Sequence, residues 1–267
     1  MEWKSDYIEY DGNKIHYFHS GNKNPIVLLH GVTDNGLCLS PVAEKLSENF
    51  LTIMPDARGH GLTDVSQKIF SYEVMAKDIA MLIQNLNLEK SQIIGHSMGA
   101  AVASFIASKY PELVSRIILE DPYFRFKKTN KILKGLAKPL IKLGMKKMLG
   151  GSYEKILKRG RKQNPTWSED EMLPWAESKV LFKENDGKKL VMGLVDDETE
   201  WKEILSNINC PTLLITSDKG MTKDDKTREI VELIKNCKWV KIEGAGHNIR
   251  REQYKRYMEE VQDFLVP

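Results

Sequence analysis

The sequence predicts an α/β fold, in which helices cover both faces of a mostly parallel β-sheet. A continuous apolar run at residues 25–30 is typical of a strand that is buried on both faces. Strand-like segments alternate with segments of helical spacing along most of the chain, which indicates parallel pairing. Two alternating segments joined by a turn at residues 11–13 predict an opening hairpin, placed at the antiparallel edge of the sheet.

The elements follow one another in a regular order. Strands are expected at residues 7–10, 14–18, 25–30, 50–54, 91–94, 114–120, 211–216 and 239–242. Helices are expected at residues 40–49, 72–87, 100–107, 224–236 and 250–265. Pro41 in the first turn marks the start of the first of these helices.

Composition narrows the class of protein. The 267 residues are 41% hydrophobic, which suffices for a sizeable core, and no run of about eighteen apolar residues suggests a membrane span. A formal net charge of +3 is too small to indicate a nucleic-acid partner, and the start of the chain lacks an apolar signal core, so a cytoplasmic location is expected. Cys38, Cys210 and Cys237 have no metal-like spacing and are interpreted as reduced thiols, so no metal site is expected.

A segment of different character interrupts the alternation. Residues 125–162 contain fourteen Lys and Arg against one acid, Glu154. Apolar residues recur there at helical spacing and are punctuated by Gly135, Pro139 and Gly144, which predicts short amphipathic helices with lysine-rich outer faces. We therefore expect a core domain of residues 1–121 and 210–267, and a helical lid of residues 122–209 over the carboxyl ends of the strands.

The residues of the predicted lid do not identify the substrate. Its basic stretch fits a solvated face, a surface that makes weak contact with anionic membranes, or a site for acidic substrates. Eight of its apolar residues either line an acyl or aromatic pocket or form the lid's own core: Leu136, Leu140, Met145, Met148, Trp167, Leu173, Trp175 and Phe182.

The candidate nucleophile is Ser97. It lies in the sequence Gly-His-Ser-Met-Gly at residues 95–99, between a short apolar segment and a helical run of small residues. A serine at such a junction is held on a tight, strained turn that presents its hydroxyl, and the flanking glycines avoid collisions with the strand and the helix. The alternative is a helix start that Ser97 merely caps.

A serine hydroxyl needs a base to take its proton, and His247 is the candidate. It follows a predicted strand and precedes the last helix, so it lies at the same carboxyl edge of the sheet as Ser97. His96, next to the nucleophile, is a candidate for touching the substrate.

Acyl transfer also needs donors for the oxygen that gains negative charge. The backbone amides of Val32 and Met98 are the candidates for this oxyanion hole. Gly31 lets the backbone approach the reacting carbon, whereas the side chain of His30 is expected to brace the loop.

Over nearly its full length the chain resembles the α/β-hydrolase superfamily, in a form similar to serine esterases and lipases. The residues that carry the resemblance are His-Gly at 30–31, Asp-Ala-Arg-Gly-His-Gly at 56–61, the nucleophile sequence at 95–99 and Gly-Ala-Gly-His at 244–247. The resemblance implies an eight-stranded, mostly parallel sheet with a lid inserted after the sixth strand. It also implies that residues 56–61 hold the core loops together.

The third catalytic residue departs from the common family pattern. Most members carry the acid in a Gly-x-x-Asp-like turn after the strand that follows the lid; here Ser217 replaces the glycine, Gly220 takes the acid's place and Asp218 falls two residues early. Haloalkane dehalogenases carry the acid at the end of the preceding strand, which corresponds to Asp121. Asp121 and Asp218 both remain candidates, with Glu120 as a third.

The expected activity is cleavage of a small-molecule carboxylic ester, or of a related acyl bond, through an acyl-enzyme on Ser97, with no metal or organic cofactor. A dehalogenase is disfavoured because its nucleophile is an aspartate. Lactone opening, carbon–carbon bond hydrolysis and acyl transfer use the same serine chemistry, and a non-catalytic binding protein on this fold is a further alternative. The sequence indicates no oligomeric state.

Overall fold

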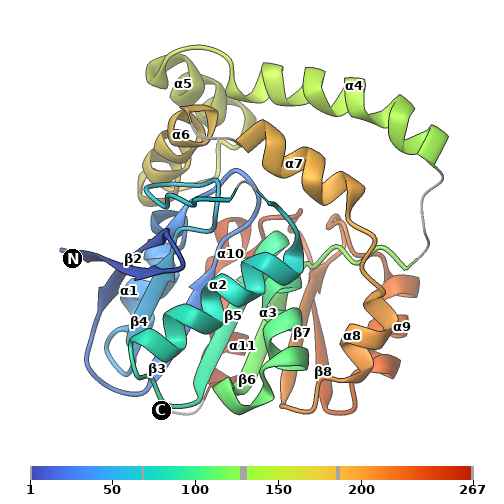
Figure 1. Ribbon diagram of the computed structural model, residues 1–267. Helices are drawn as coiled ribbons and strands as arrows, with labels where there is room; N and C mark the ends of the chain where they lie inside the picture. Colours follow the sequence, from blue (N-terminus) through green and yellow to red (C-terminus); the bar gives the residue numbers. More distant parts are fainter. Residues whose placement is uncertain (1, 68, 127–130, 185–186, 266–267) are drawn as a thin grey trace.

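The predicted mostly parallel sheet is confirmed. The structure is a computed structural model that describes residues 2–67, 69–126, 131–184 and 187–265. Its eight strands are ordered β1-β2-β4-β3-β5-β6-β7-β8 (Figure 1). In chain order they are β1 (Lys4–Tyr10), β2 (Asn13–Ser20), β3 (Pro25–Leu29), β4 (Leu51–Pro55), β5 (Ser91–His96), β6 (Val114–Glu120), β7 (Thr212–Ser217) and β8 (Cys237–Ile242).

The opening hairpin forms the antiparallel edge, as predicted. β1 pairs with β2 and β2 with β4 in antiparallel fashion, whereas all further neighbours are parallel. β3, β5 and β7 are buried along their whole length, which explains why β3 is a continuous apolar run and why β5 and β7 have apolar centres.

Two layers of helices enclose the sheet. Val27, Ile93 and Leu214 face one hydrophobic cluster, and their neighbours Ile94 and Leu213 face the other, because successive side chains of a strand point to opposite faces. The first cluster is covered by α2 (Tyr72–Asn85), α3 (Met98–Lys109), α8 (Trp201–Ser206) and α9 (Asp224–Leu233). The second is covered by α1 (Ser40–Leu46), α10 (Ile249–Glu252) and α11 (Tyr254–Phe264).

One core helix differs from its prediction. The helix expected at residues 250–265 is divided into α10 and α11, because the backbone of Gln253 (φ −134°, ψ 50°) leaves the helical region. The division lets Arg250 and Arg251 turn into the core from α10, while α11 buries its own apolar face.

Between β6 and β7 the chain forms α4 (Lys131–Leu149), α5 (Tyr153–Gln163), α6 (Glu169–Glu184) and α7 (Gly187–Asp196), followed by α8. Figure 1 shows α4–α7 above the carboxyl ends of the strands. α8 lies lower, and its Trp201 packs on Phe105 of α3 with ring centroids 5.5 Å apart.

The expectation of short helices at the start of this segment was wrong. α4 is a single helix of 19 residues that runs through Gly135, Pro139 and Gly144. A β-carbon at either glycine would meet nothing within 4 Å, so these glycines face open space and mark no turn. The inner face of α4, which includes the buried Met145 and Leu149, packs onto the rest of the molecule, and this burial outweighs the poor helix propensity of glycine and proline.

Candidate active site

Ser97 lies on a strained turn between β5 and α3. Its backbone has φ 53° and ψ −109°, a conformation that is rare for a residue with a side chain. Its N–H donates to the carbonyl oxygen of Glu120 at 2.9 Å, which ties the turn to the end of β6. The turn is the geometry expected of a nucleophile that is presented at the edge of the sheet.

Glycines make this turn possible. A β-carbon on Gly95 would lie 2.3 Å from the carbonyl oxygen of Gly99, and one on Gly99 would lie 2.1 Å from that of Leu29. Both distances are well inside van der Waals contact. Only glycine at these two positions therefore lets β5, α3 and β3 approach one another around Ser97.

His247 forms a close pair with Asp121. It follows β8, and its Nδ1 lies 2.6 Å from Oδ2 of Asp121. A carboxylate only accepts hydrogen bonds, so Nδ1 carries the proton and Nε2 is left as the basic nitrogen of the ring. Asp121 is fully buried and also accepts from the N–H groups of Met221 (2.7 Å) and Thr222 (2.9 Å). Three donors therefore fix the carboxylate.

The other two candidate acids lie elsewhere. Asp218 is exposed, and its Oδ1 accepts from the N–H of Gly244 at 2.9 Å, which closes the turn before the histidine loop. Glu120 is buried and accepts from the backbone N–H of Arg250 at 3.0 Å; burial raises the pKa of its carboxyl, against the charge of Arg250. The carboxylate that the structure brings to His247 is that of Asp121.

The structure explains two residues in the turn after β7 that depart from the Gly-x-x-Asp-like pattern. Gly220 stands where most relatives of this kind would carry the acid, and a β-carbon there would lie 2.8 Å from both carboxylate oxygens of Asp121. Ser217 replaces the usual glycine, and its hydroxyl donates to the carbonyl oxygen of Gly246 at 2.7 Å. The first change makes room for Asp121, and the second anchors the residue before His247.

The backbone around the candidate oxyanion hole is also close-packed. A β-carbon on Gly31 would lie 2.7 Å from Nδ1 of His96 and 3.6 Å from the β-carbon of Ser97, so the chain leading to Val32 passes directly beside Ser97. Met98 is the first residue of α3, and its N–H therefore lacks a partner within the helix.

His96 contacts the histidine loop. Its Nε2 lies 3.0 Å from the carbonyl oxygen of His247, and the two rings lie 4.7 Å apart between centroids. Because a carbonyl oxygen only accepts, Nε2 carries the proton. Burial, with a further contribution from Arg250, holds the pKa of His96 well below its ordinary value, so the ring is neutral. The structure thus places His96 between Gly31 and the backbone of His247.

Residues 56–61 hold the loops together, as the resemblance implied. Asp56 accepts from the N–H of Gly36 (2.8 Å) and lies 2.8 Å from Nδ1 of His16. Arg58 forms a two-pronged buried pair with Asp78, at 2.5 and 2.6 Å. His30 likewise braces its loop, since its Nε2 accepts from the N–H of Ala57 at 3.0 Å.

A buried charge network next to the site was not found from the sequence. Asp34, two residues after Val32, pairs with Lys179 of α6 at 2.6 Å and with Arg251 at 3.0 Å. Arg251 also binds Glu171 of α6 at 2.8 Å. Burial opposes ionisation of Asp34, but Arg251 and Lys179 outweigh it and hold its pKa well below the usual range.

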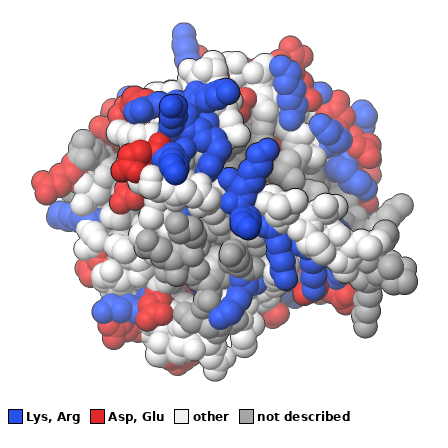
Figure 2. All heavy atoms as spheres, turned by 90° about the horizontal axis from the view of Figure 1, so that it is seen from above, with Lys and Arg blue, Asp and Glu red and all other residues white. Residues whose placement is uncertain are grey.

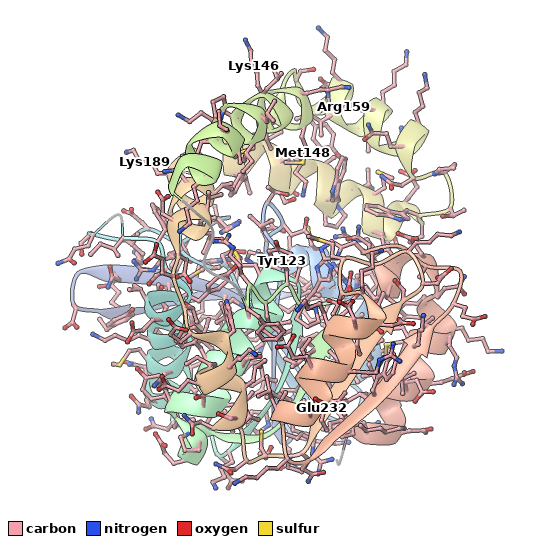
Figure 3. The ribbon with its side chains drawn as sticks, turned by 90° about the vertical axis from the view of Figure 1, so that its right-hand side faces the viewer. Tyr123, Lys146, Met148, Arg159, Lys189 and Glu232 are labelled. Carbon is pink, nitrogen blue, oxygen red and sulfur yellow. The ribbon has the colours of Figure 1, made fainter. Side chains whose placement is uncertain are left out.

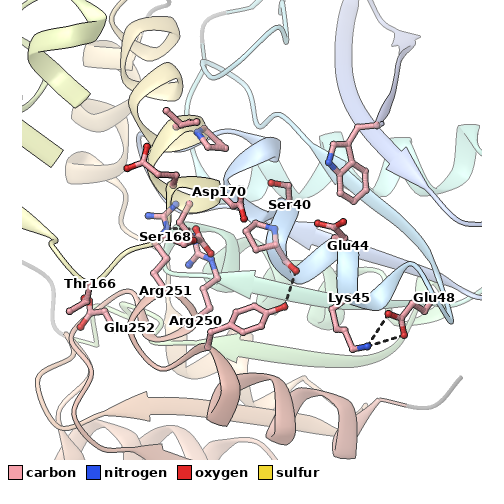
Figure 4. A pocket seen from close by; sticks show the side chains of 17 residues that line it. Ser40, Glu44, Lys45, Glu48, Thr166, Ser168, Asp170, Arg250, Arg251 and Glu252 are labelled. Atoms are coloured by element: carbon pink, nitrogen blue, oxygen red, sulfur yellow. Dashed lines mark hydrogen bonds and ion pairs between the residues drawn. The ribbon is translucent and has the colours of Figure 1, made fainter. Parts of the chain in front are cut away.

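The network joins α6, the loop after β3 and the helix after His247. Its members come from distant segments with no common spacing, so no sequence pattern indicates it. Arg250 and Arg251 also line a cleft of about 850 Å³ between α1 and α6 (Figure 4). Neither Ser97 nor His247 lines this cleft, so it is separate from the candidate active site.

The part of the chain that the structure describes contains no group of three or more His, Cys, Asp or Glu side chains placed to hold a metal ion. Within the same residues, no helix is both long enough and apolar enough to cross a membrane.

Comparisons with known proteins give the family. A family model described as alpha/beta hydrolase fold matches residues 24–250. The chain is 39% identical to 2-(acetamidomethylene)succinate hydrolase of Mesorhizobium japonicum over 102 residues, 37% of either chain. It is 34% identical to a soluble epoxide hydrolase of Corynebacterium sp. (strain C12) over 111 residues, 42% of this chain and 39% of that protein. The matched segments thus span well under half of these relatives.

Solved structures match over almost the whole chain at lower identity. A crystal structure of E-2-(acetamidomethylene)succinate hydrolase superposes with a TM-score of 0.83 at 19% identity, covering 98% of this chain and 99% of that one. The enol-lactonase from Burkholderia xenovorans LB400 superposes with a TM-score of 0.78 at 20% identity, covering 98% and 100%. The likeness to these structures shows a shared fold. With the family model matching most of the chain, the protein belongs to the α/β hydrolase fold family.

Proposed function

We propose that this protein is a serine hydrolase that cleaves a carboxylic ester, or a related acyl bond, through an acyl-enzyme on Ser97. The observation that carries the proposal is the pairing of His247 with the buried Asp121 at 2.6 Å, on a loop that His96 ties to the strained turn of Ser97. The proposed nucleophile, base and acid come from the carboxyl ends of three parallel strands, β5, β8 and β6, which meet at one edge of the sheet.

The first half of the proposed reaction forms the acyl-enzyme. The Ser97 oxygen attacks the carbonyl carbon while Nε2 of His247 takes the hydroxyl proton. The carbonyl oxygen becomes an oxyanion, which the N–H groups of Val32 and Met98 stabilise. The bond to the leaving group then breaks, and the imidazolium of His247 gives its proton to the departing alkoxide. Asp121 stabilises the imidazolium and holds the ring in this orientation.

The second half releases the acid. Nε2 of His247 takes a proton from water as the water oxygen attacks the acyl carbon, and the same two amides hold the second oxyanion. The bond to the Ser97 oxygen breaks, and the proton on His247 returns to that oxygen. The proposed cycle consumes one water and needs neither metal nor organic cofactor.

We also propose that the helices between β6 and β7 form the lid over this site. α4–α7 lie above the edge at which Ser97 and His247 are found (Figure 1). Phe182 of α6 supports this, since its ring packs on His60 at 4.8 Å between centroids. In the predicted lid, Met145, Trp167, Trp175 and Phe182 are buried and Leu136, Leu140 and Leu173 are exposed. Trp167 and Trp175 belong to a small cluster of mostly lid residues, whereas Met145 and Phe182 join the hydrophobic cluster on one face of the sheet.

Lactone opening is the second candidate, because it follows the same steps with the leaving alkoxide still tethered to the acyl group. It is favoured by the structural likeness to an enol-lactonase and to an enzyme described as degrading N-acyl homoserine lactones, the latter at a TM-score of 0.78 and 21% identity.

A fluorophosphonate probe, followed by peptide mapping, tests the proposal. We expect the label on Ser97, steady turnover of p-nitrophenyl butyrate by the unmodified chain, and loss of both in Ser97→Ala. Ser206→Ala is the matched control, because Ser206 is exposed on α8 and should behave as the unmodified chain. No label on Ser97 and no turnover of esters or lactones would instead indicate a binding protein on this fold.

A further inference from the structure

The outer side of α4 carries a stripe of exposed leucines. Leu136, Leu140 and Leu143 are 67, 71 and 65% exposed, and their spacing of four and three residues places them on one face of the helix. We call these three residues the leucine stripe. The opposite face of α4 is the one that is buried, through Met145 and Leu149. The outermost surface of this helix is therefore apolar at its centre, in addition to the lysines that were expected there.

Lysines border the leucine stripe. Lys142 and Lys146 lie on one flank and Lys147 continues the stripe, and all three are exposed. We call them the α4 lysines. None of them has an ion-pair partner among the residues that the structure describes. The nearby acids Asp196 and Glu198 are bound to Lys138 (2.7 Å) and Lys134 (3.2 Å) on the inner side of the helix.

The same face continues onto α5. Lys155, Lys158 and Lys162 are exposed there as well. Seen from above, Lys and Arg side chains gather over a broad part of this surface (Figure 2). In Figure 3, Lys146 points away from the sheet, whereas Met148 lies on the side of α4 that faces it. The apolar stripe and the cations therefore share one outward face.

We propose that α4 docks this protein on an anionic lipid bilayer. The helix lies flat, with the leucine stripe in the boundary between headgroups and acyl chains and the α4 lysines against lipid phosphates. An exposed apolar stripe of this kind in a soluble domain marks a contact surface. A bilayer offers an apolar layer and a continuous sheet of negative charge around it, which complements leucines that have cations at their side. The proposal is independent of the chemistry at Ser97.

Vesicle binding by the full chain tests the apolar part. Co-sedimentation is measured with phosphatidylcholine vesicles, with and without phosphatidylglycerol. We expect binding only when phosphatidylglycerol is present. A triple variant removes the leucine stripe by the exchanges Leu136→Ser, Leu140→Ser and Leu143→Ser. Its partition coefficient should be lower on the order of tenfold or more, because each exchange removes apolar area from the interface.

The charged part is tested with two matched triple variants. The first variant exchanges the α4 lysines, by Lys142→Gln, Lys146→Gln and Lys147→Gln, and should bind on the order of tenfold more weakly. Added salt should weaken binding by the unmodified chain. The control removes the same charge from exposed lysines away from α4 and α5 and should bind as the unmodified chain does: Lys90→Gln, Lys235→Gln and Lys255→Gln.

Insertion is followed directly with Leu140→Trp. Its fluorescence should shift to the blue on anionic vesicles and be quenched by lipids brominated on their acyl chains, which also covers the case in which the serine variant fails to fold. No binding to anionic vesicles would overturn the proposal, as would binding that the leucine exchanges leave unchanged. A lipid-free dimer that the leucine exchanges dissociate would assign the face to a second copy of the chain instead.

Discussion

At the scale of single residues, a few ångströms of space decide which carboxylate pairs with His247. Asp121 reaches the ring of His247 from the end of β6, and Gly220 leaves the volume that its carboxylate occupies. Asp218 belongs to the same turn as Gly220, yet its carboxylate is engaged by Gly244. A sequence shows which carboxylates are near the turn, but not which of them fills the space beside the imidazole.

Exchange of the two aspartates separates their roles. With an amide at position 121, the ring of His247 loses the acceptor that fixes its tautomer, and kcat/KM for p-nitrophenyl butyrate should fall on the order of ten-thousand-fold in Asp121→Asn. Asp218→Asn is the matched control and should retain activity within about threefold, because its carboxylate only closes a turn. Equal losses in the two variants would contradict the assignment of Asp121.

The space at Gly220 allows a second prediction. A β-carbon there would lie 2.8 Å from both carboxylate oxygens of Asp121, so Gly220→Ala should displace the carboxylate and lower kcat/KM on the order of a hundredfold. In Asp121→Gly the same space is empty. Gly220→Asp added to that variant should therefore recover at least about tenfold of the lost activity.

Failure of the double variant to exceed Asp121→Gly, with both proteins folded by circular dichroism, would show that position 220 cannot supply the acid.

At the scale of elements, helix α4 shows why glycine and proline alone do not predict where a helix ends. Glycine in an exposed helix costs about 0.5–1 kcal/mol relative to alanine, and a helix tolerates that cost when its other face is buried. Gly135 and Gly144 face open space, so a methyl group at either position fits. Gly160 in α5 looks the same in the sequence, but a β-carbon there would lie 2.5 Å from the ring of Trp175.

These three glycines should respond in opposite directions. Gly135→Ala and Gly144→Ala should each raise the free energy of unfolding by about 0.5–1 kcal/mol. Gly160→Ala should lower it by about 1–3 kcal/mol, because the methyl group overpacks against an indole ring. Urea titration followed by circular dichroism measures all three. Destabilisation by the first two variants would mean that α4 bends at its glycines.

The charge network holds α6 to the loop after β3 and to α10, which follows His247. Arg251 has partners on both sides, Glu171 at 2.8 Å and Asp34 at 3.0 Å, and it lies over the ring of Trp167 at 4.6 Å. Arg251→Met removes the positive charge that compensates these buried carboxylates. It should lower the free energy of unfolding by about 3–5 kcal/mol.

Arg256→Met is the matched control for this exchange. Arg256 is 57% exposed on α11 and pairs with the exposed Glu259 and with the largely buried Glu260, which keeps Lys238 at 3.3 Å as a second cation, so the loss should stay below about 1 kcal/mol. Similar losses in the two arginine variants would show that the network contributes no more than surface pairs do.

At the scale of the whole molecule, the sheet was predictable and the electrostatics were not. Apolar runs such as residues 25–30 state directly that a strand is covered on both faces, and Ser97 and His247 could be placed at one edge because parallel strands end on the same side. The burial of Lys179 and Arg251 could not be read from the chain. Their positions look like ordinary charged helix positions until α6 and α10 meet over Asp34.

Buried histidines give the whole molecule a pH-dependent stability. Burial lowers the pKa of His30, of His60 to about 3, and of His96 well below its ordinary value. Above about pH 6.5 these rings are neutral in the folded and in the unfolded chain, so they contribute no pH dependence. Below that pH these histidines bind protons in the unfolded chain but stay neutral in the folded chain, so the free energy of unfolding falls.

Each such histidine adds a slope of up to about 1.4 kcal/mol per pH unit below pH 6.5. Guanidinium titrations at pH 7.5, 6.5, 5.5 and about 5 measure it, a range that lies above the ordinary pKa of the carboxylates. His60→Asn removes one of these sites, so its slope between the two lowest pH values should be shallower than that of the unmodified chain by about 1.4 kcal/mol per pH unit. His60 accepts a hydrogen bond from Thr33 at 3.2 Å, so the variant is also expected to be less stable at pH 7.5, and only the slope decides. An unchanged slope would mean that His60 takes up a proton in the folded protein, although its burial disfavours the charged ring.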